Sequence, residues 1–129
     1  MPAADEARAL DFALRVMSSA GYGTLRHAAP AVPPDLEQRI VHCAIPESLV
    51  LSYSGGGVMV GANGSAFFYD QAVPILANLV LALRDGVPRA VIDILAMVDP
   101  ASTDIVTRLL RDLVGAGALF AGVPSERGV

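Results

Sequence analysis

The chain has 129 residues, of which 53% are hydrophobic and 17% are charged, and this size and composition predict one folded domain. Its formal net charge is −4 and all nine of its basic residues are arginine, which argues against nucleic acid as the partner because phosphate binding depends on clustered cations. Charged residues interrupt the apolar runs well before the ~20 residues of a membrane-spanning helix. The acidic start of the sequence lacks the basic region of a signal peptide. We therefore predict a cytoplasmic protein without a membrane partner.

The first predicted element is an amphipathic helix over residues 4–20, which ends at the Gly-Tyr-Gly of 21–23. Its apolar stripe consists of Ala7, Leu10, Leu14 and Met17. The proline-rich stretch that follows, HAAPAVPPD, disfavours both helix and sheet and therefore predicts a linker. We accordingly divide the chain into an N-terminal helix and linker at 1–34, a main domain at 35–122 and a flexible tail at 123–129.

Four segments rich in branched aliphatic or aromatic residues predict the strands of a small antiparallel sheet. They are RIVHCAI at 39–45, SLVLSY at 48–53, GVMVGA at 57–62 and SAFFY at 65–69. Asn63-Gly64, between the last two, is a strong hairpin signal because a type I′ turn needs two residues with positive φ. Ser54–Gly57 predicts a looser hairpin turn before it.

The glycine-rich stretch Ser54–Asp70 raises the alternative of a phosphate-binding loop. A Walker-type loop needs a lysine followed by serine or threonine, and the chain contains no lysine. A dinucleotide fingerprint that starts at Gly55 requires glycine where the chain has Val60, and it opens a helix where the chain has SAFFY. We therefore assign these glycines to turns.

After Asp70 the apolar residues follow a helical period, which predicts three helices. The first is capped near Asp70, carries Pro74 in or near its first turn and ends before Gly86. The second opens at Pro88 and closes before Pro100.

The third predicted helix begins around residues 101–103 and ends at the Gly-Ala-Gly of 115–117. Its inward residues are Ile105, Val106, Leu109, Leu110, Leu113 and Val114. Its outer face carries Asp104, Thr107, Arg108 and Arg111. A small antiparallel sheet followed by three helices predicts an α+β fold that is winged helix-turn-helix-like, with an extra N-terminal helix.

Few residues are candidates for catalysis or metal binding. His42 and Cys43 are adjacent, so on a strand their side chains point to opposite faces and do not bind one metal together. Neither they nor His27 stand in a pattern that indicates a nucleophilic triad, and the single cysteine forms no internal disulfide. The carboxylates of the last two predicted helices are typical of solvated faces. We predict no catalytic residues, no metal site and no cofactor, and hence a protein that is not an enzyme.

The predicted layout admits two kinds of function. In one, the third helix enters a DNA groove with Arg108 and Arg111, as in a winged-helix transcriptional regulator. In the other, the sheet edge and the third helix form a groove for a peptide, which joins the sheet as an extra strand.

The segment LVLSYSGGGVMVGANGSAFFYDQAVPILANLVLALRDG is followed by VPRAVIDILAMV and then by DIVTRLLRDLVGAGAL. These segments form one pattern over roughly residues 48–120. It consists of a short aromatic strand with a polar end (FFYD), an apolar helix, Asp-Gly, a second apolar helix and a last helix ending in GAL. This pattern resembles the precursor-peptide recognition element of ribosomally synthesised and post-translationally modified peptide (RiPP) biosynthesis. That family includes the pyrroloquinoline-quinone peptide chaperone and the discrete lasso-peptide recognition proteins.

The resemblance implies that the chain binds the leader region of a precursor peptide as an added antiparallel strand and presents it to a peptide-modifying enzyme. The implied cleft lies between the strand at 65–69 and the helix that begins near Asp104, with the arginines of that helix facing leader carboxylates. The residues assigned to peptide binding on this basis are Ala66, Phe67, Phe68, Tyr69, Asp104, Arg108, Arg111 and Asp112. The N-terminal helix is a candidate arm for homodimer formation. A DNA-binding regulator and a structural domain of a larger enzyme remain the alternatives.

Overall fold

A computed structural model of the chain describes residues 32–124, so the predicted helix at 4–20 lies outside the described residues. The described residues form an α+β fold in a winged-helix-like arrangement, with short 3₁₀ turns between the main elements. The elements in chain order are η2 (Leu36–Gln38), β1 (Arg39–His42), η3 (Pro46–Ser48), β2 (Leu49–Ser54), β3 (Gly57–Ala62), β4 (Ser65–Tyr69), α2 (Val73–Leu83), β5 (Arg89–Ala90), α3 (Val91–Ala96), η4 (Pro100–Ser102), α4 (Thr103–Gly115) and β6 (Phe120–Pro124).

The predicted hairpins are confirmed as an antiparallel sheet in the order β2-β3-β4. Asn63 and Gly64 have φ values of 48° and 91°, as the type I′ turn between β3 and β4 requires. Gly55 and Gly56 also have positive φ, at 55° and 83°, and they form a second two-residue turn between β2 and β3. The glycine-rich stretch therefore turns the chain twice within one small sheet.

A second three-stranded sheet, in the order β5-β1-β6, was not predicted. Strand β1 is shorter than the predicted 39–45, because the chain leaves the strand after His42 and enters the η3 turn. The second helix begins at Val91 rather than at Pro88, because Arg89–Ala90 pair with β1. Strand β6 pairs with the other side of β1 and runs to Pro124, two residues into the segment predicted as a tail.

Two predictions about helix ends have different outcomes. Pro74 lies in the first turn of α2, as expected. The predicted cap near Asp70 is wrong: α2 begins after Ala72, which has a left-handed φ of 51°, and no side chain caps the helix. Helix α4 matches the predicted third helix in its bounds, and its buried residues are Val106, Leu109, Leu110, Leu113 and Val114.

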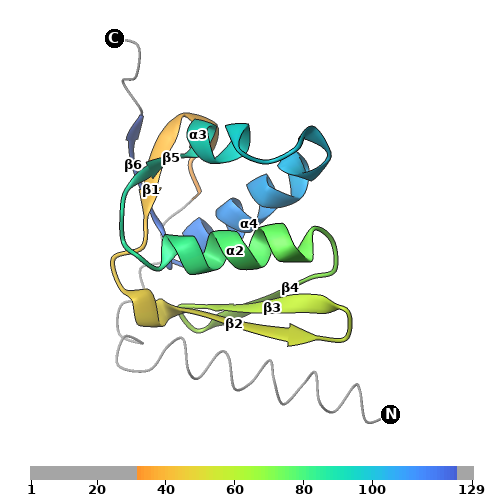
Figure 1. The fold of residues 1–129 in the computed structure, drawn as a ribbon. Helices are drawn as coiled ribbons and strands as arrows, with labels where there is room; N and C mark the ends of the chain where they lie inside the picture. The colour runs from red at the N-terminus through yellow and green to blue at the C-terminus, as the bar shows by residue number, and fades with distance from the viewer. Residues whose placement is uncertain (1–31, 125–129) are drawn as a thin grey trace.

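The core lies between the helices and the inner face of the β2-β3-β4 sheet. In Figure 1, α2 runs above this sheet and α4 lies behind α2, while the second sheet and α3 form the upper part. The largest buried side chains come from both sheets and all three α-helices of the described part: Leu36, Val41, Leu49, Val58, Val60, Tyr69, Leu76, Leu83, Val91, Leu109, Leu110, Leu113 and Leu119. Strand β4 is at one edge of this sheet, and Tyr69 and Phe67 bring it beside α4.

Candidate functional site: a groove between β4 and α4

Tyr69, at the end of β4, connects the edge strand to α4. Its side chain is 2% exposed, and its hydroxyl donates a hydrogen bond of 2.6 Å to Oδ2 of Asp112. The guanidinium of Arg108 lies 5.7 Å from the centre of the Tyr69 ring, within the range of a cation–π contact. Burial, together with the hydrogen bond to the Asp112 carboxylate, raises the pKa of Tyr69 far above its ordinary value. This cluster fixes the distance between β4 and α4.

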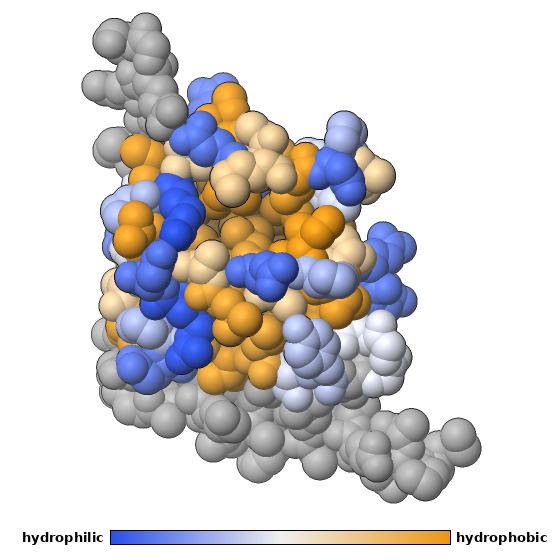
Figure 2. Space-filling view, viewed as in Figure 1, coloured by the Kyte–Doolittle hydropathy of each residue, from blue (hydrophilic) through white to orange (hydrophobic). Residues whose placement is uncertain are grey.

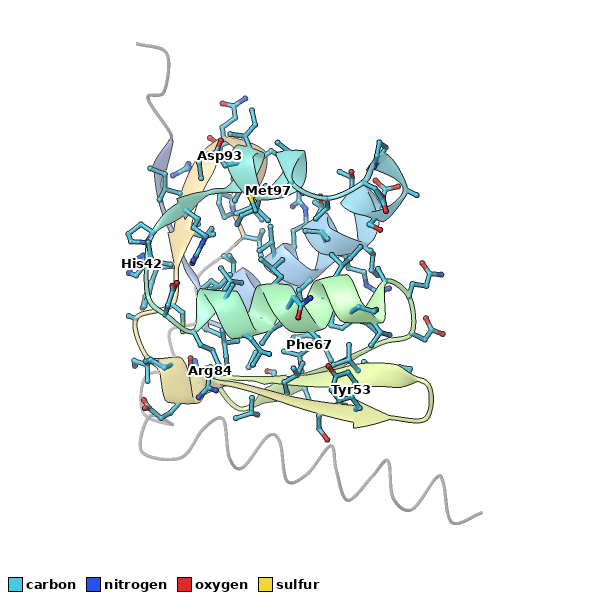
Figure 3. The ribbon with its side chains drawn as sticks, viewed as in Figure 1. His42, Tyr53, Phe67, Arg84, Asp93 and Met97 are labelled. Atoms are coloured by element: carbon cyan, nitrogen blue, oxygen red, sulfur yellow. The ribbon has the colours of Figure 1, made fainter. Side chains whose placement is uncertain are left out.

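Next to this cluster, a groove of about 410 Å³ separates β4 from the C-terminal half of α4. It is lined by Val32, Ser65, Phe67, Arg111, Asp112, Gly115 and Ala116. Phe67 points from the sheet toward the helices and is partly buried against the core (Figure 3). The small residues Gly115 and Ala116 leave space beside the end of the helix. Val32 lies on the other side of this space, and a Cβ added to Gly115 would be 3.3 Å from Val32 Cγ2. The groove is therefore apolar at its base and charged at its rim.

The outer edge of β4 carries backbone groups that do not bond within the β2-β3-β4 sheet. The amide of Asn63 donates to the carbonyl of Ser48, so odd-numbered residues of β3 bond to β2 and even-numbered residues bond to β4. By the register of β3 and β4, Ser65, Phe67 and Tyr69 are then bonded inward. Consequently the N–H and C=O groups of Ala66 and Phe68 face the outer edge. Among residues 32–124, no strand pairs with that edge.

The two cations of α4, Arg108 and Arg111, have different surroundings. Arg111 lies in the rim, and its guanidinium contacts Oε1 of Glu37 at 3.4 Å. Arg108 is exposed and lies over the Tyr69 ring. Asp112 accepts a hydrogen bond from Tyr69, whereas Arg111 contacts a carboxylate from outside the helix.

The structure brings together five of the eight predicted site residues: Phe67, Tyr69, Arg108, Arg111 and Asp112. Tyr69 is the core aromatic of β4, and Phe67 is the one that lines the groove. Ala66 and Phe68 place their side chains on the opposite face of the sheet and contribute only backbone groups to the edge. Asp104 is exposed in the first turn of α4 and does not line the groove.

Sequence reasoning missed four residues that line this groove, Val32, Ser65, Gly115 and Ala116. It also missed Glu37, which contacts Arg111 at the rim. Val32 belongs to the stretch that was predicted as a linker, and Glu37 lies 74 residues from Arg111 in the chain. No local pattern connects such positions, because their contact depends on how η2 packs beside α4. The Gly-Ala-Gly motif was a usable signal, since small residues at the end of α4 predict open space there.

A second, more apolar groove of about 390 Å³ lies between α2 and α3, and Ile75, Leu79 and Met97 line it. Figure 2 shows apolar residues gathered on this side of the molecule. Met97 is 86% exposed at the end of α3. Arg89 also lines this groove, but it donates to both carboxylate oxygens of Asp85, at 2.9 and 2.6 Å. These hydrogen bonds lower the pKa of Asp85 to about 2.

His42 and Cys43 have separate surroundings. The His42 ring stacks on Phe120 with centres 5.5 Å apart, whereas Cys43 is buried and its thiol donates to the carbonyl of Ile45. Burial raises the pKa of the Cys43 thiol. Within residues 32–124, no three His, Cys, Asp or Glu side chains lie together as metal ligands would. No helix in this part of the chain is long and apolar enough to cross a membrane.

Comparisons of the chain with protein-family models, with curated proteins and with solved structures found no match.

Proposed function

We propose that this domain binds the leader region of a ribosomally made precursor peptide as an added strand on β4 and holds it for a modifying enzyme. The observation that supports this proposal most directly is a strand edge beside a groove, with which no strand of residues 32–124 pairs. The edge offers the backbone groups of Ala66 and Phe68, and the groove begins with Phe67 on the same strand. Main-chain pairing provides affinity in this mode, and neighbouring pockets provide specificity.

The alternation of a strand explains how one peptide would use both features. Its backbone would bond to Ala66 and Phe68, and every second side chain would point toward α4. Those side chains would meet Phe67 and Ala116 at the base of the groove and Arg111 at its rim. We expect a dissociation constant in the micromolar range or tighter, equivalent to about −8 kcal/mol.

Charge makes a smaller contribution to this proposed binding. Arg108 and Arg111 would face carboxylates of the leader, and each exposed pair contributes at most about 1 kcal/mol. Helix α4 carries two aspartates and two arginines among its charged residues, Asp104, Arg108, Arg111 and Asp112, so its formal charge is zero. A recognition helix for DNA normally places an excess of cations against the phosphates, which makes the peptide the better-supported ligand.

The direct test is fluorescence anisotropy with labelled leader peptides from precursor genes that neighbour this gene, and with random duplex DNA as a second ligand. Ala66→Pro removes one outward N–H, and an edge strand tolerates proline at such a position. We expect this variant to lose most of its peptide binding and keep its folded circular dichroism spectrum.

Tyr53→Pro is the matched control. Tyr53 lies on β2, at the opposite edge of the same sheet, is 66% exposed, and pairs with Val58 so that its N–H also faces outward. This variant should bind the leader as the natural protein does. Equal binding by folded Ala66→Pro and the natural protein would contradict strand addition on β4, and salt-sensitive binding of DNA alone would favour the transcriptional regulator.

A further inference from the structure

Glu37 reaches the rim of the groove from a segment that is firmly anchored. Its neighbour Leu36 is fully buried in the core, so the η2 turn is held in place. Arg39 adds two polar contacts, one to Oδ1 of Asp35 at 3.0 Å and one to the carbonyl of Gly122 at 3.0 Å. The Glu37 carboxylate is therefore positioned beside α4 by packing around η2 and not by its pair with Arg111 alone.

The Glu37–Arg111 pair has the properties of a contact that can be exchanged. Its N–O distance is 3.4 Å, longer than the 2.7–2.9 Å of strong charge-assisted hydrogen bonds. The two side chains are 46% and 41% exposed, and a pair of this kind contributes little to stability. By contrast, the 2.6 Å bond of Asp112 holds that carboxylate on Tyr69. Of the two carboxylates, only that of Glu37 lies in a weak contact with Arg111.

We infer that Glu37 is paired with Arg111 in the empty protein, and that an acidic side chain of the bound peptide replaces Glu37 as the partner of Arg111. This inference rests on the proposed function. Arg111 lines the groove while its guanidinium is directed to Glu37, so a peptide carboxylate at the rim reaches the same cation. A peptide with a neutral side chain at that position leaves the internal pair in place and gains nothing from Arg111. Arg111 thus makes the groove selective for an acidic residue, and Glu37 lowers the affinity for that residue because its own pair must be displaced.

The inference predicts opposite effects for the two partners. Glu37→Gln should strengthen the binding of an acidic peptide by about two- to fivefold, the range of an exposed ion pair. Arg111→Gln should weaken it by a similar factor, and in the Arg111→Gln background the Glu37→Gln change should have no effect. Raised salt should reduce these differences.

Glu47→Gln is the matched control. Glu47 is the middle residue of η3, as Glu37 is of η2, and the substitution removes the same charge away from the groove. It should leave the affinity for an acidic peptide unchanged. If Glu47→Gln strengthens binding as much as Glu37→Gln does, the gain comes from net charge and the exchange model is wrong.

The experiment uses a displayed library of random 12-residue peptides, selected on the full-length natural protein, on Glu37→Gln and on Arg111→Gln. Recovered peptides and their Glu→Gln or Asp→Asn versions are then measured by fluorescence anisotropy. Enrichment of one acidic position, stronger binding to Glu37→Gln and loss of the preference in Arg111→Gln would support the exchange. Peptides that bind at the edge of β4 but show no preference for an acidic residue would overturn this inference and leave the proposed function standing. Recovery of no peptide on any of the three proteins would overturn both.

Discussion

The hydroxyl of Tyr69 and the carboxylate of Asp112, 43 residues apart in the chain, form a 2.6 Å hydrogen bond that joins the edge strand β4 to helix α4. The bond lies beside the groove and sets the separation of its two walls. Asp112 therefore has a positioning role in the proposed site, since its carboxylate accepts the hydrogen bond from the edge strand.

Removing this bond should weaken the fold. Tyr69→Phe keeps the ring in the core and deletes the donor, so we expect a loss of about 1–2 kcal/mol in the free energy of unfolding, measured by urea denaturation. Asp112→Asn keeps an acceptor oxygen and should lose less. A Tyr69→Phe protein as stable as the natural one would show that the bond contributes nothing net.

Stability should also depend on Tyr69 at alkaline pH. The pKa of Tyr69 is raised in the folded state, so above the ordinary tyrosine value of about 10 the unfolded chain releases this proton while the folded protein retains it. The free energy of unfolding should then decrease as pH rises, by up to about 1.4 kcal/mol per pH unit from this group. Tyr69→Phe should show a shallower decrease between about pH 9.5 and 11. The buried Cys43 thiol adds its own decrease to both proteins and cancels in the comparison. Parallel curves for the two proteins would contradict this assignment.

Gly57, at the start of β3, should not accept a side chain. A Cβ at this position would lie 2.5 Å from Phe68 Cζ and 2.5 Å from the carbonyl oxygen of Tyr69. The Phe68 ring can move, but the backbone oxygen is part of the sheet, so we expect Gly57→Ala to destabilise the protein by about 1–3 kcal/mol in urea. Gly122→Ala is the control, because its nearest contact is an ordinary 3.5 Å to the Ile40 carbonyl. Similar losses in both variants would mean that backbone entropy, and not overlap, determines the cost.

Asn63 has a second role beyond its turn. Its side-chain amide donates to the carbonyl of Ala116 at 3.0 Å, just past the end of α4, and the residue is only 5% exposed. Asn63→Asp keeps a residue that tolerates the left-handed turn but places a carboxylate against a carbonyl oxygen. We expect a loss of about 1–3 kcal/mol in the free energy of unfolding. Asn63→Gly, which keeps the turn and adds no charge, should lose less, and the reverse order would argue that the turn dominates.

Elements specified by neighbouring residues could be predicted from the sequence. Asn63-Gly64 identified its hairpin because two consecutive positive φ values exclude most other residues. The bounds and buried face of α4 followed from its apolar period and from the Gly-Ala-Gly that ends it. The alternation of a strand places the side chains of Phe67 and Tyr69 on one side of β4 and that of Phe68 on the other. It does not show which side packs on the core.

Contacts between distant segments were decided only by the tertiary structure. The two residues of β5 carry no periodicity of their own and become a strand because β1 offers them hydrogen bonds. Tyr69 became the buried aromatic because α4 places Asp112 against its hydroxyl, and Arg111 met Glu37 because the buried Leu36 holds η2 beside the helix. Sequence patterns report on residues within a few positions of each other, whereas the groove consists of side chains from β4, α4 and the segment before β1. Its shape and charge therefore depend on packing that no local pattern encodes.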